Sequence, residues 1–378
     1  MVRLLVFAVL LALITWWLHR RLVRATALTR PWSTVADAAL LILYVLAVVG
    51  VGSGEAFATS WARPVGFAGW AWIGAGLYLL LGLGALAAVS GIVRVAARRP
   101  HDESRRRALR VATGAVVVAA VGAAGYGVAE AARPRVTTVR VPLRRLPAEF
   151  DGVRVALVAD LHVGPARGEP FTRRVVDLVL REKPDLVILG GDLTDGVVDK
   201  VAPDLAPLAD LHAPLGVFGV SGNHESYADD VGSWLDVWED LGVRVLRNEH
   251  VTLTRDGAAI DVAGVYDFDS KDPYAPDLPA ALAGHDPDRF VLLAAHQPKQ
   301  VVEASELGVD LQLSGHTHGG QMWPLGVLVP LQQPTVTGLD RFGDTLVYTT
   351  RGVGTWGPPV RVATPPELTI LELARDAG

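Results

Sequence analysis

Residues 217–225 of the 378-residue chain are Val-Phe-Gly-Val-Ser-Gly-Asn-His-Glu, an apolar run that ends in Gly222-Asn223-His224. Short runs of this kind are typical of buried strands. The chain has only 2 asparagines, with 10 histidines and 39 glycines, so an ordered Gly-Asn-His has a chance probability of about 0.005. We therefore interpret Gly222-Asn223-His224 as a functional cluster that follows the carboxyl end of a strand.

The same pattern continues on both sides of this segment. From about residue 140, short runs of valine, isoleucine and leucine alternate with stretches typical of helices, which predicts an α/β fold. Helices are predicted over 173–181 and 233–241. The predicted strands are 153–159, 186–189, 217–220, 260–265, 290–295, 311–313 and 346–349.

Polar clusters follow five of these strands. Ligands of open α/β sheets bind beyond the carboxyl ends of strands, so the fold can bring together clusters that span about 160 residues of chain. The clusters are Asp160 with His162, Gly191 with Asp192, Gly222 with Asn223 and His224, His296, and Gly315 with His316, Thr317 and His318.

These clusters supply carboxylate, imidazole and amide oxygen ligands, and the chain has no cysteine. Such a set favours Mn, Fe or Zn over an oxygen-only Mg or Ca site. A catalytic ion usually has about three protein ligands plus water, so seven ligands predict two divalent ions that share Asp192. The candidate ligands are Asp160, His162, Asp192, Asn223, His296, His316 and His318.

Two ions that share a water lower its pKa, so that a nucleophile exists near neutral pH, and they neutralise charge on a phosphoryl group. The ligand set therefore predicts hydrolysis of phosphate esters. His224 directly follows the candidate ligand Asn223 and is placed to donate a proton to the leaving oxygen or to bind a phosphate oxygen.

The clusters resemble the motif series of the calcineurin-like metallophosphoesterase family, which is DxH, GDxxD, GNHD or GNHE, H and GHxH. The resemblance covers about residues 150–373, and segments 314–321, 348–354 and 366–368 are similar to a membrane-associated bacterial branch that includes a twin-arginine-exported phosphoesterase. Here the series is Asp160-Leu161-His162, Gly191-Asp192-Leu193-Thr194-Asp195, Gly222-Asn223-His224-Glu225, His296 and Gly315-His316-Thr317-His318.

The resemblance implies a four-layer αββα sandwich of two mixed sheets. It implies that His224 is the proton donor and that Asp195 supports the ligands or pairs with that histidine; a helix N-cap at Asp195 is the alternative. Glu225 replaces an aspartate common in relatives, a change that we expect to leave activity intact. The implied ligands are Asp160, His162 and His318 on one ion, Asn223, His296 and His316 on the other, and Asp192 between them.

The first third of the chain differs from the rest. Residues 1–135 hold 15 arginines and 5 acidic residues, net +10, whereas 136–378 have a net charge of −15. Four apolar runs, 2–18, 35–57, 65–93 and 109–129, are long enough to cross hydrocarbon. They lack a polar stripe of helical period, which favours four membrane spans over a buried bundle.

These runs predict a transmembrane region over residues 1–132, a linker over 133–149 and a metallophosphoesterase domain over 150–378. Arginine-rich loops stay in the cytoplasm, and this places both chain ends and the catalytic domain on the extracytoplasmic side of the cell membrane. The arginines are Arg20, Arg21, Arg24 and Arg30 in the first loop, and Arg94, Arg98, Arg99, Arg105, Arg106, Arg107 and Arg110 in the third.

Residues 104–110, Ser-Arg-Arg-Arg-Ala-Leu-Arg, are similar to a twin-arginine export signal, with Ala129-Glu130-Ala131 as a small-residue cleavage site. An ordinary arginine-rich helix end explains the same residues equally well. We keep both interpretations.

The sequence thus predicts a multi-pass membrane enzyme that hydrolyses phosphomonoesters, phosphodiesters or pyrophosphates. The apolar segment 322–331 predicts either a lip for acyl or prenyl chains of envelope lipids or a core loop. A receptor or scaffold that uses the fold to bind through metals, and a cytoplasm-facing phosphodiesterase, are the alternatives. The charge of −15 makes nucleic acid an unexpected partner.

Overall fold

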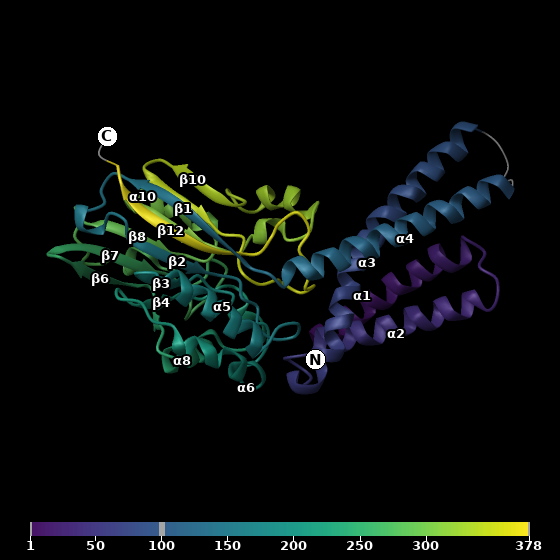
Figure 1. The fold of residues 1–378 in the computed structure, drawn as a ribbon, viewed down its shortest axis with the longest axis horizontal. Coiled ribbons are helices and arrows are strands. Elements are labelled where there is room, and N and C mark those ends of the chain that lie inside the picture. Colours follow the sequence, from purple (N-terminus) through teal and green to yellow (C-terminus); the bar gives the residue numbers. More distant parts are fainter. Residues whose placement is uncertain (1, 98–102, 377–378) are drawn as a thin grey trace.

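The computed structural model describes residues 2–97 and 103–376. We name residues 2–131 the helical region and residues 135–376 the sandwich. Figure 1 shows the sandwich at one end of the long helices, with the two parts in direct contact. The sandwich is a mixed α/β structure with two sheets, as the sequence predicts.

Four helices of the helical region are long and apolar enough to span a membrane, which agrees with the four predicted runs. The second ends five residues earlier than predicted, at Gly52, and the third begins six residues earlier, at Thr59. The helices are α1 (Val2–His19, continued by the π-helical η1, Arg20–Arg24), α2 (Trp32–Gly52), α3 (Thr59–Ala97) and α4 (Glu103–Ala131).

Helices α2 and α3 pack closely through glycines, because a Cβ on Gly66 would lie only 2.6 Å from the Cα of Gly50. The segment that joins α1 to α2 and carries four of the arginines lies at the end of the helices away from the sandwich (Figure 1). Arg98 and Arg99 lie outside the described residues, as do the side chains of Arg94, Arg105 and Arg106.

The export-like segment 104–110 forms the start of α4, and residues 129–131 form its last turn. Ala131 is buried, and its carbonyl accepts a hydrogen bond from Arg167 of the sandwich at 2.9 Å. A cleavage site at this position is therefore covered by the fold.

The first sheet has the strand order β1-β12-β2-β3-β4-β5. Strands β2 to β5 are parallel to one another, while β12 is antiparallel to β2 and parallel to β1. The strands are β1 (Arg135–Leu143), β2 (Arg154–Val158), β3 (Leu186–Leu189), β4 (Val217–Gly219), β5 (Arg244–Val245) and β12 (Glu367–Arg375).

The second sheet has the order β10-β11-β9-β8-β7-β6, with four parallel central strands and an antiparallel strand at each edge. Central parallel strands leave their carboxyl ends at one edge, where a site can form. The strands are β6 (Glu249–Arg255), β7 (Ala258–Gly264), β8 (Phe290–Ala294), β9 (Leu311–Ser314), β10 (Gly338–Phe342) and β11 (Thr345–Thr349).

Helices cover the outer face of each sheet. The α-helices are α5 (Glu169–Glu182), α6 (Val198–Val201), α7 (Glu225–Ala228), α8 (Val231–Asp240), α9 (Leu278–Ala281) and α10 (Val301–Glu306). Short 3₁₀ helices complete the loops, and they are η2 (Ala148–Phe150), η3 (Ala202–Asp210), η4 (Pro298–Gln300), η5 (His318–Gly320) and η6 (Leu325–Leu331).

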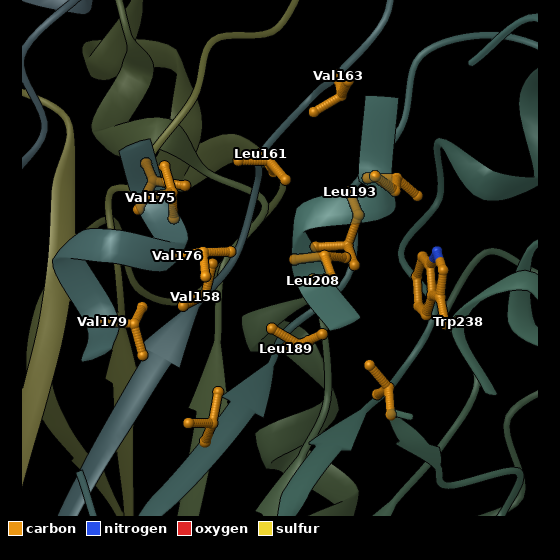
Figure 2. Packing of buried hydrophobic residues seen from close by; sticks show 14 of the residues in the cluster. Val158, Leu161, Val163, Val175, Val176, Val179, Leu189, Leu193, Leu208 and Trp238 are labelled. Carbon is orange, nitrogen blue, oxygen red and sulfur yellow. The ribbon is translucent and has the colours of Figure 1, made fainter. Parts of the chain in front are cut away.

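Three buried clusters separate the four layers. Ile188 and Leu292 belong to the core between the two sheets. Val158 and Leu189 pack with α5 and α8 on the outer face of the first sheet, and Figure 2 shows Val176 of α5 beside Val158. A third cluster joins the second sheet to α9 and α10. This arrangement is an αββα sandwich, as the motif resemblance implies.

All seven predicted strands are present, with ends shifted by at most two residues. Residues 135–143, however, form strand β1 instead of part of a linker, and they pair along their whole length with β12. The sequence hides this strand because β1 is an edge strand whose residues are partly exposed, including Arg135, Thr137 and Arg140, so it lacks an apolar run.

Candidate metal centre

The seven predicted ligands meet at the carboxyl ends of β2, β3, β4, β8 and β9. Three groups of side chains there could hold a metal ion, and within each group the ligand atoms lie within 4.8 Å of one another. Asp192 belongs to two of the groups. The groups are Asp160 with His162 and His318, Asp192 with His162 and His224, and Asp192 with His296 and His316.

One half of the centre contains three of these side chains. The Nε2 atoms of His162 and His318 are 3.0 Å apart. Asp160 Oδ1 lies 3.6 Å from Nε2 of His318, and Asp192 Oδ2 lies 3.7 Å from Nε2 of His162. These three side chains and Asp192 therefore direct ligand atoms into one small volume.

The other half lies on the far side of Asp192. His296 Nε2 is 3.2 Å from the same Asp192 Oδ2, and His316 Nδ1 is 2.8 Å from Asn223 Oδ1. Because one carboxylate oxygen faces a histidine on each side, Asp192 has the position that a bridging ligand requires.

Two of the histidines, His296 and His162, fit a metal because one ring nitrogen of each already has a protein acceptor. His296 Nδ1 lies 2.8 Å from the Gly190 carbonyl, and its buried Nε2 has no hydrogen-bond partner among the described residues. His162 Nδ1 lies 3.0 Å from Asp195 Oδ1. Metal-binding histidines commonly donate their other N–H to a carbonyl or carboxylate in this way.

Five candidate ligands have left-handed backbone. Side chains other than glycine rarely adopt this conformation, which costs about 1–3 kcal/mol at each residue and is concentrated at functional sites. The strained backbone of these loops thus directs the side chains toward the candidate metal centre. The φ angles are 59° for Asp160, 48° for His162, 53° for Asp192, 71° for His316 and 51° for His318.

Glycines let these loops approach one another. A Cβ on Gly222 would lie 2.5 Å from the backbone nitrogen of Asp192, and one on Gly315 would lie 2.6 Å from Asp160 Oδ2. Real Cβ atoms are essentially never that close to a neighbour. The glycines of the motifs are therefore required for the ligands to converge.

The comparisons with known proteins agree with this geometry. The calcineurin-like phosphoesterase family matches residues 153–320. A protein of Aquifex aeolicus that is named an uncharacterized metallophosphoesterase is 34% identical over 245 residues, which are 63% of this chain and 91% of that protein.

The chain belongs to the calcineurin-like metallophosphoesterase family. A zebrafish (Danio rerio) transmembrane protein with metallophosphoesterase domain is 35% identical over 270 residues, 68% of this chain and 62% of that protein. An uncharacterized metallophosphoesterase of Helicobacter pylori is 37% identical over 246 residues, 64% of each chain. This chain thus spans less than two thirds of the length of these two relatives.

Asp195 links two histidines of the metallophosphoesterase centre. Its Oδ1 lies 3.0 Å from Nδ1 of His162 and 2.5 Å from Nδ1 of His224. Burial raises the pKa of Asp195, but the two imidazoles outweigh this effect and hold it well below its usual range. The alternative of a helix N-cap does not apply, because α6 begins at Val198 with Val197 before it.

His224 lies close to the carboxylates of Asp192, Asp195 and Glu225. Burial lowers the pKa of His224, but the negative charges of Asp192 and Asp195 outweigh it and raise the pKa to about 9. The backbone N–H of His224 also donates to Asp192 Oδ1 at 2.8 Å. The ring therefore carries a proton at neutral pH beside the candidate bridge.

The pKa values of the other histidines follow their surroundings. Burial, then the charge of His296, lowers the pKa of His316 to about 3. Burial, then the guanidinium of Arg361, holds the pKa of His318 well below its usual value. Burial opposes a proton on His296, but Asp192 raises its pKa, and the same attraction favours a cation at Nε2.

Glu225 has a larger role than the sequence indicates. It is completely buried and accepts backbone hydrogen bonds from both ligand loops. The donors are the N–H groups of Asp192 at 3.0 Å, Leu193 at 2.8 Å, Thr194 at 3.3 Å and Gly222 at 2.7 Å. The family motif has a carboxylate at this position. Only the structure shows that this carboxylate connects the loop of Asp192 to the loop of Gly222 by hydrogen bonds.

Arg361 is a residue of the centre that the sequence did not reveal. Its buried guanidinium donates to the His318 carbonyl at 2.8 Å and lies 3.0 Å from Nδ1 of His318. Burial lowers the pKa of Arg361 to about 9. Arginine 43 positions after its partner has no spacing signal, so only the fold identifies it.

Proposed function

We propose that this protein spans a membrane and hydrolyses phosphoesters at two divalent metal ions. Membership of the family supports metal-dependent phosphoester hydrolysis. The observation that supports the two-ion arrangement is Asp192 Oδ2, which faces His162 on one side and His296 on the other. Phosphomonoesters, phosphodiesters and pyrophosphates all have the bond that such a centre attacks.

In this proposal the donor set of carboxylates, imidazoles and one amide oxygen holds Mn, Fe or Zn. Two cations bound there would lower the pKa of a water between them and neutralise the charge of the phosphoryl group. One ion takes Asp160, His162 and His318, the other takes Asn223, His296 and His316, and both take Asp192.

His224 is the proposed proton donor. Hydrolysis forms a bond between the water oxygen and phosphorus and breaks the bond from phosphorus to the leaving oxygen, which needs a proton as it departs. The short contact with Asp195 orients the ring, and the negative charge of that carboxylate favours a proton on it. Asp195 acts as a positioning residue for both His224 and His162.

The test is turnover of a panel of phosphomonoesters, phosphodiesters and lipid pyrophosphates by the full chain with added Mn. We expect Asp192→Ala to abolish Mn-dependent turnover and His224→Ala to lower it about 10²–10⁴-fold. Asp177→Ala, at an exposed carboxylate on α5, is the matched control and keeps full activity. Metal-dependent ligand binding without turnover of any substrate would instead support the receptor or scaffold alternative.

We further propose that the four helices cross the cell membrane and that the sandwich is extracytoplasmic. The arginine-rich segment between α1 and α2 lies at the end of the helices away from the sandwich (Figure 1), and arginine-rich loops stay inside. Because the chain has no cysteine, Asp177→Cys and Arg21→Cys give clean single labels. An impermeant maleimide should label only Asp177→Cys in intact cells, and the reverse result would establish a cytoplasm-facing phosphodiesterase.

The proposed substrate is linked to an envelope lipid. Met322 at the start of the apolar segment is buried, but most of the rest forms η6 (Leu325–Leu331), which has no buried residue, and this argues against a core loop and for the lip. Trp323 is 63%, Val327 73% and Leu331 80% exposed. Changing Trp323 and Leu331 to Ser should lower turnover of lipid-embedded phosphoesters more than that of soluble ones, and equal losses on both would remove the lip.

A further inference from the structure

A cavity of about 670 Å³ lies between the helical region and the sandwich. His224 and Trp356 line it on the sandwich side. Phe7 of α1 and Trp70 and Ile73 of α3 line it on the helical side. The centre that belongs to the sandwich therefore opens onto a space whose opposite wall is made by helices apolar enough to span a membrane.

Specific contacts fix the helical wall close to the centre. Arg3, at the start of α1, donates to the Tyr227 carbonyl at 2.8 Å and pairs with Glu55 at 3.0 Å. The ring of Tyr227 in turn lies tilted against that of His224, with ring centroids 4.6 Å apart. The beginning of α1 is thus held against α7, the short helix that directly follows His224.

Further contacts hold α3 and α4 in place. Arg63 donates to the Gly164 carbonyl at 2.7 Å and pairs with Asp204. Val360 lies against Gly74 of α3 and Gly127 of α4, where a Cβ on either glycine would meet it at 2.9 Å or less. Contacts of this kind on several sides indicate that the cavity is a built feature of the fold.

The position of His224 tells which part of a substrate the cavity would receive. A proton donor must lie within hydrogen-bond reach of the leaving oxygen, so the leaving group extends from His224 into the space that this residue lines. On the helical side the wall includes Phe7, Trp70 and Ile73, which favour hydrocarbon over a polar group, and it also holds the paired charges of Arg3 and Glu55. The Phe7 side chain keeps 43% of its surface exposed.

We propose that this cavity binds the hydrocarbon chain of the leaving group of a lipid phosphoester, so that α1 and α3 form part of the substrate site. The inference rests on the proposed function and assigns the helices a role beyond anchoring. Water adds its oxygen to phosphorus, the bond to the lipid oxygen breaks, and His224 protonates that oxygen. The products are a lipid alcohol, or a lipid phosphate from a pyrophosphate, and the released phosphate.

The experiment compares butyl phosphate with dodecyl phosphate as substrates of the full chain in lipid nanodiscs with Mn. These monoesters have the same phosphate and differ only in the leaving chain. Each buried methylene favours binding by about 0.8 kcal/mol, so kcat/KM of the native protein should be at least about a hundredfold higher for dodecyl phosphate, even if only part of the chain is buried. Ile73→Trp, which narrows the cavity, should lower kcat/KM for dodecyl phosphate about tenfold more than for butyl phosphate.

Leu81→Trp is the matched control, because this residue lies on the same helix, is 45% exposed and does not line the cavity. It should retain the native ratio, which also controls for simple partition of dodecyl phosphate into the bilayer. An unchanged ratio in Ile73→Trp, or an equal ratio in both variants, would overturn the inference. Absence of metal-dependent turnover of either substrate would overturn the proposed function itself.

A second measurement does not require the variant to fold. A dodecyl phosphonate with a photoreactive group at the end of its chain resists hydrolysis and can be cross-linked to the native protein. Cross-links should map to residues 2–19 or 59–97 and should be displaced by dodecyl phosphate. Cross-links confined to residues 150–376 would contradict the assignment of the helices to the site.

Discussion

The Glu225 carboxylate accepts a hydrogen bond from the backbone N–H of Asp192 at 3.0 Å. The residue at the proposed metal bridge is thus held by the motif that also supplies Asn223 and His224. Because Asp192 has left-handed backbone, this hydrogen bond helps to maintain a conformation that the chain would otherwise avoid.

Glu225→Gln should therefore weaken metal binding. The amide places N–H donors where backbone N–H groups converge, so at least one of them loses its acceptor. We expect the affinity for Mn to fall about 10–100-fold, as measured by titration calorimetry. Glu225→Asp keeps the negative charge and should lose less affinity for Mn than Glu225→Gln. Equal affinities for the native protein and Glu225→Gln would contradict this role.

Asp192→Asn should change the metal content of the protein. An amide offers one oxygen where the carboxylate offers two, and it lacks the charge that attracts both cations. Elemental analysis after Mn loading and gel filtration should give about two ions for the native chain and one or fewer for the variant. Asp177→Asn, on the exposed face of α5, should retain both ions.

His224 should titrate at about pH 9 in protein freed of metal with EDTA. Its folded pKa lies above the ordinary value, so the attraction to Asp192 and Asp195 stabilises the fold fully at low pH and is lost as the pH rises through about 9. Asp195→Asn removes one negative neighbour and should lower this pKa in histidine NMR spectra. Adding Zn should lower it too, because the cations offset the charge of Asp192. If the pKa of His224 is the same in Asp195→Asn as in the native protein, the contact between the two residues contributes little to that pKa.

Gly127→Leu should disturb the contact between α4 and the sandwich. A side chain there would collide with Val360, whose Cγ1 would lie 2.5 Å from the new Cβ. Overpacking of this kind lowers the free energy of unfolding by about 1–3 kcal/mol, which is measurable as a lower Tm. Gly125→Leu is the control, since a Cβ there has no neighbour within 4 Å among the described residues. A Tm that falls equally in both variants would assign the loss to the helix itself.

The sequence predicted the parts of the fold that depend on local pattern. Apolar runs identified the four helices and seven strands, and the five polar clusters after strands do meet at one edge of the sandwich. Strands β1, β5, β6, β10 and β12 were not predicted. In β1, exposed arginines and threonines interrupt the apolar residues, and its pairing with β12 joins residues more than two hundred positions apart. A local sequence pattern does not indicate which distant strand will pair with β1.

The roles that the sequence could not predict all depend on distant neighbours. Arg361 looks like an isolated arginine until the fold places its guanidinium on His318. The metal-ligand role of the seven residues stays a prediction, while their convergence is observed. In the sequence, Phe7 and Ile73 are recognised only as apolar residues. Hydropathy does not distinguish a residue that faces lipid from one that lines a cavity.

The contacts of Arg63, Gly54 and Val360 join the sandwich to the helical region at several separate points. In the proposed membrane arrangement, these contacts hold the centre at one height above the bilayer. Encounter with the proposed lipid-borne substrate would then be a two-dimensional search. The rate per protein molecule should follow the mole fraction of that lipid in the membrane and should not change when vesicles of constant composition are diluted.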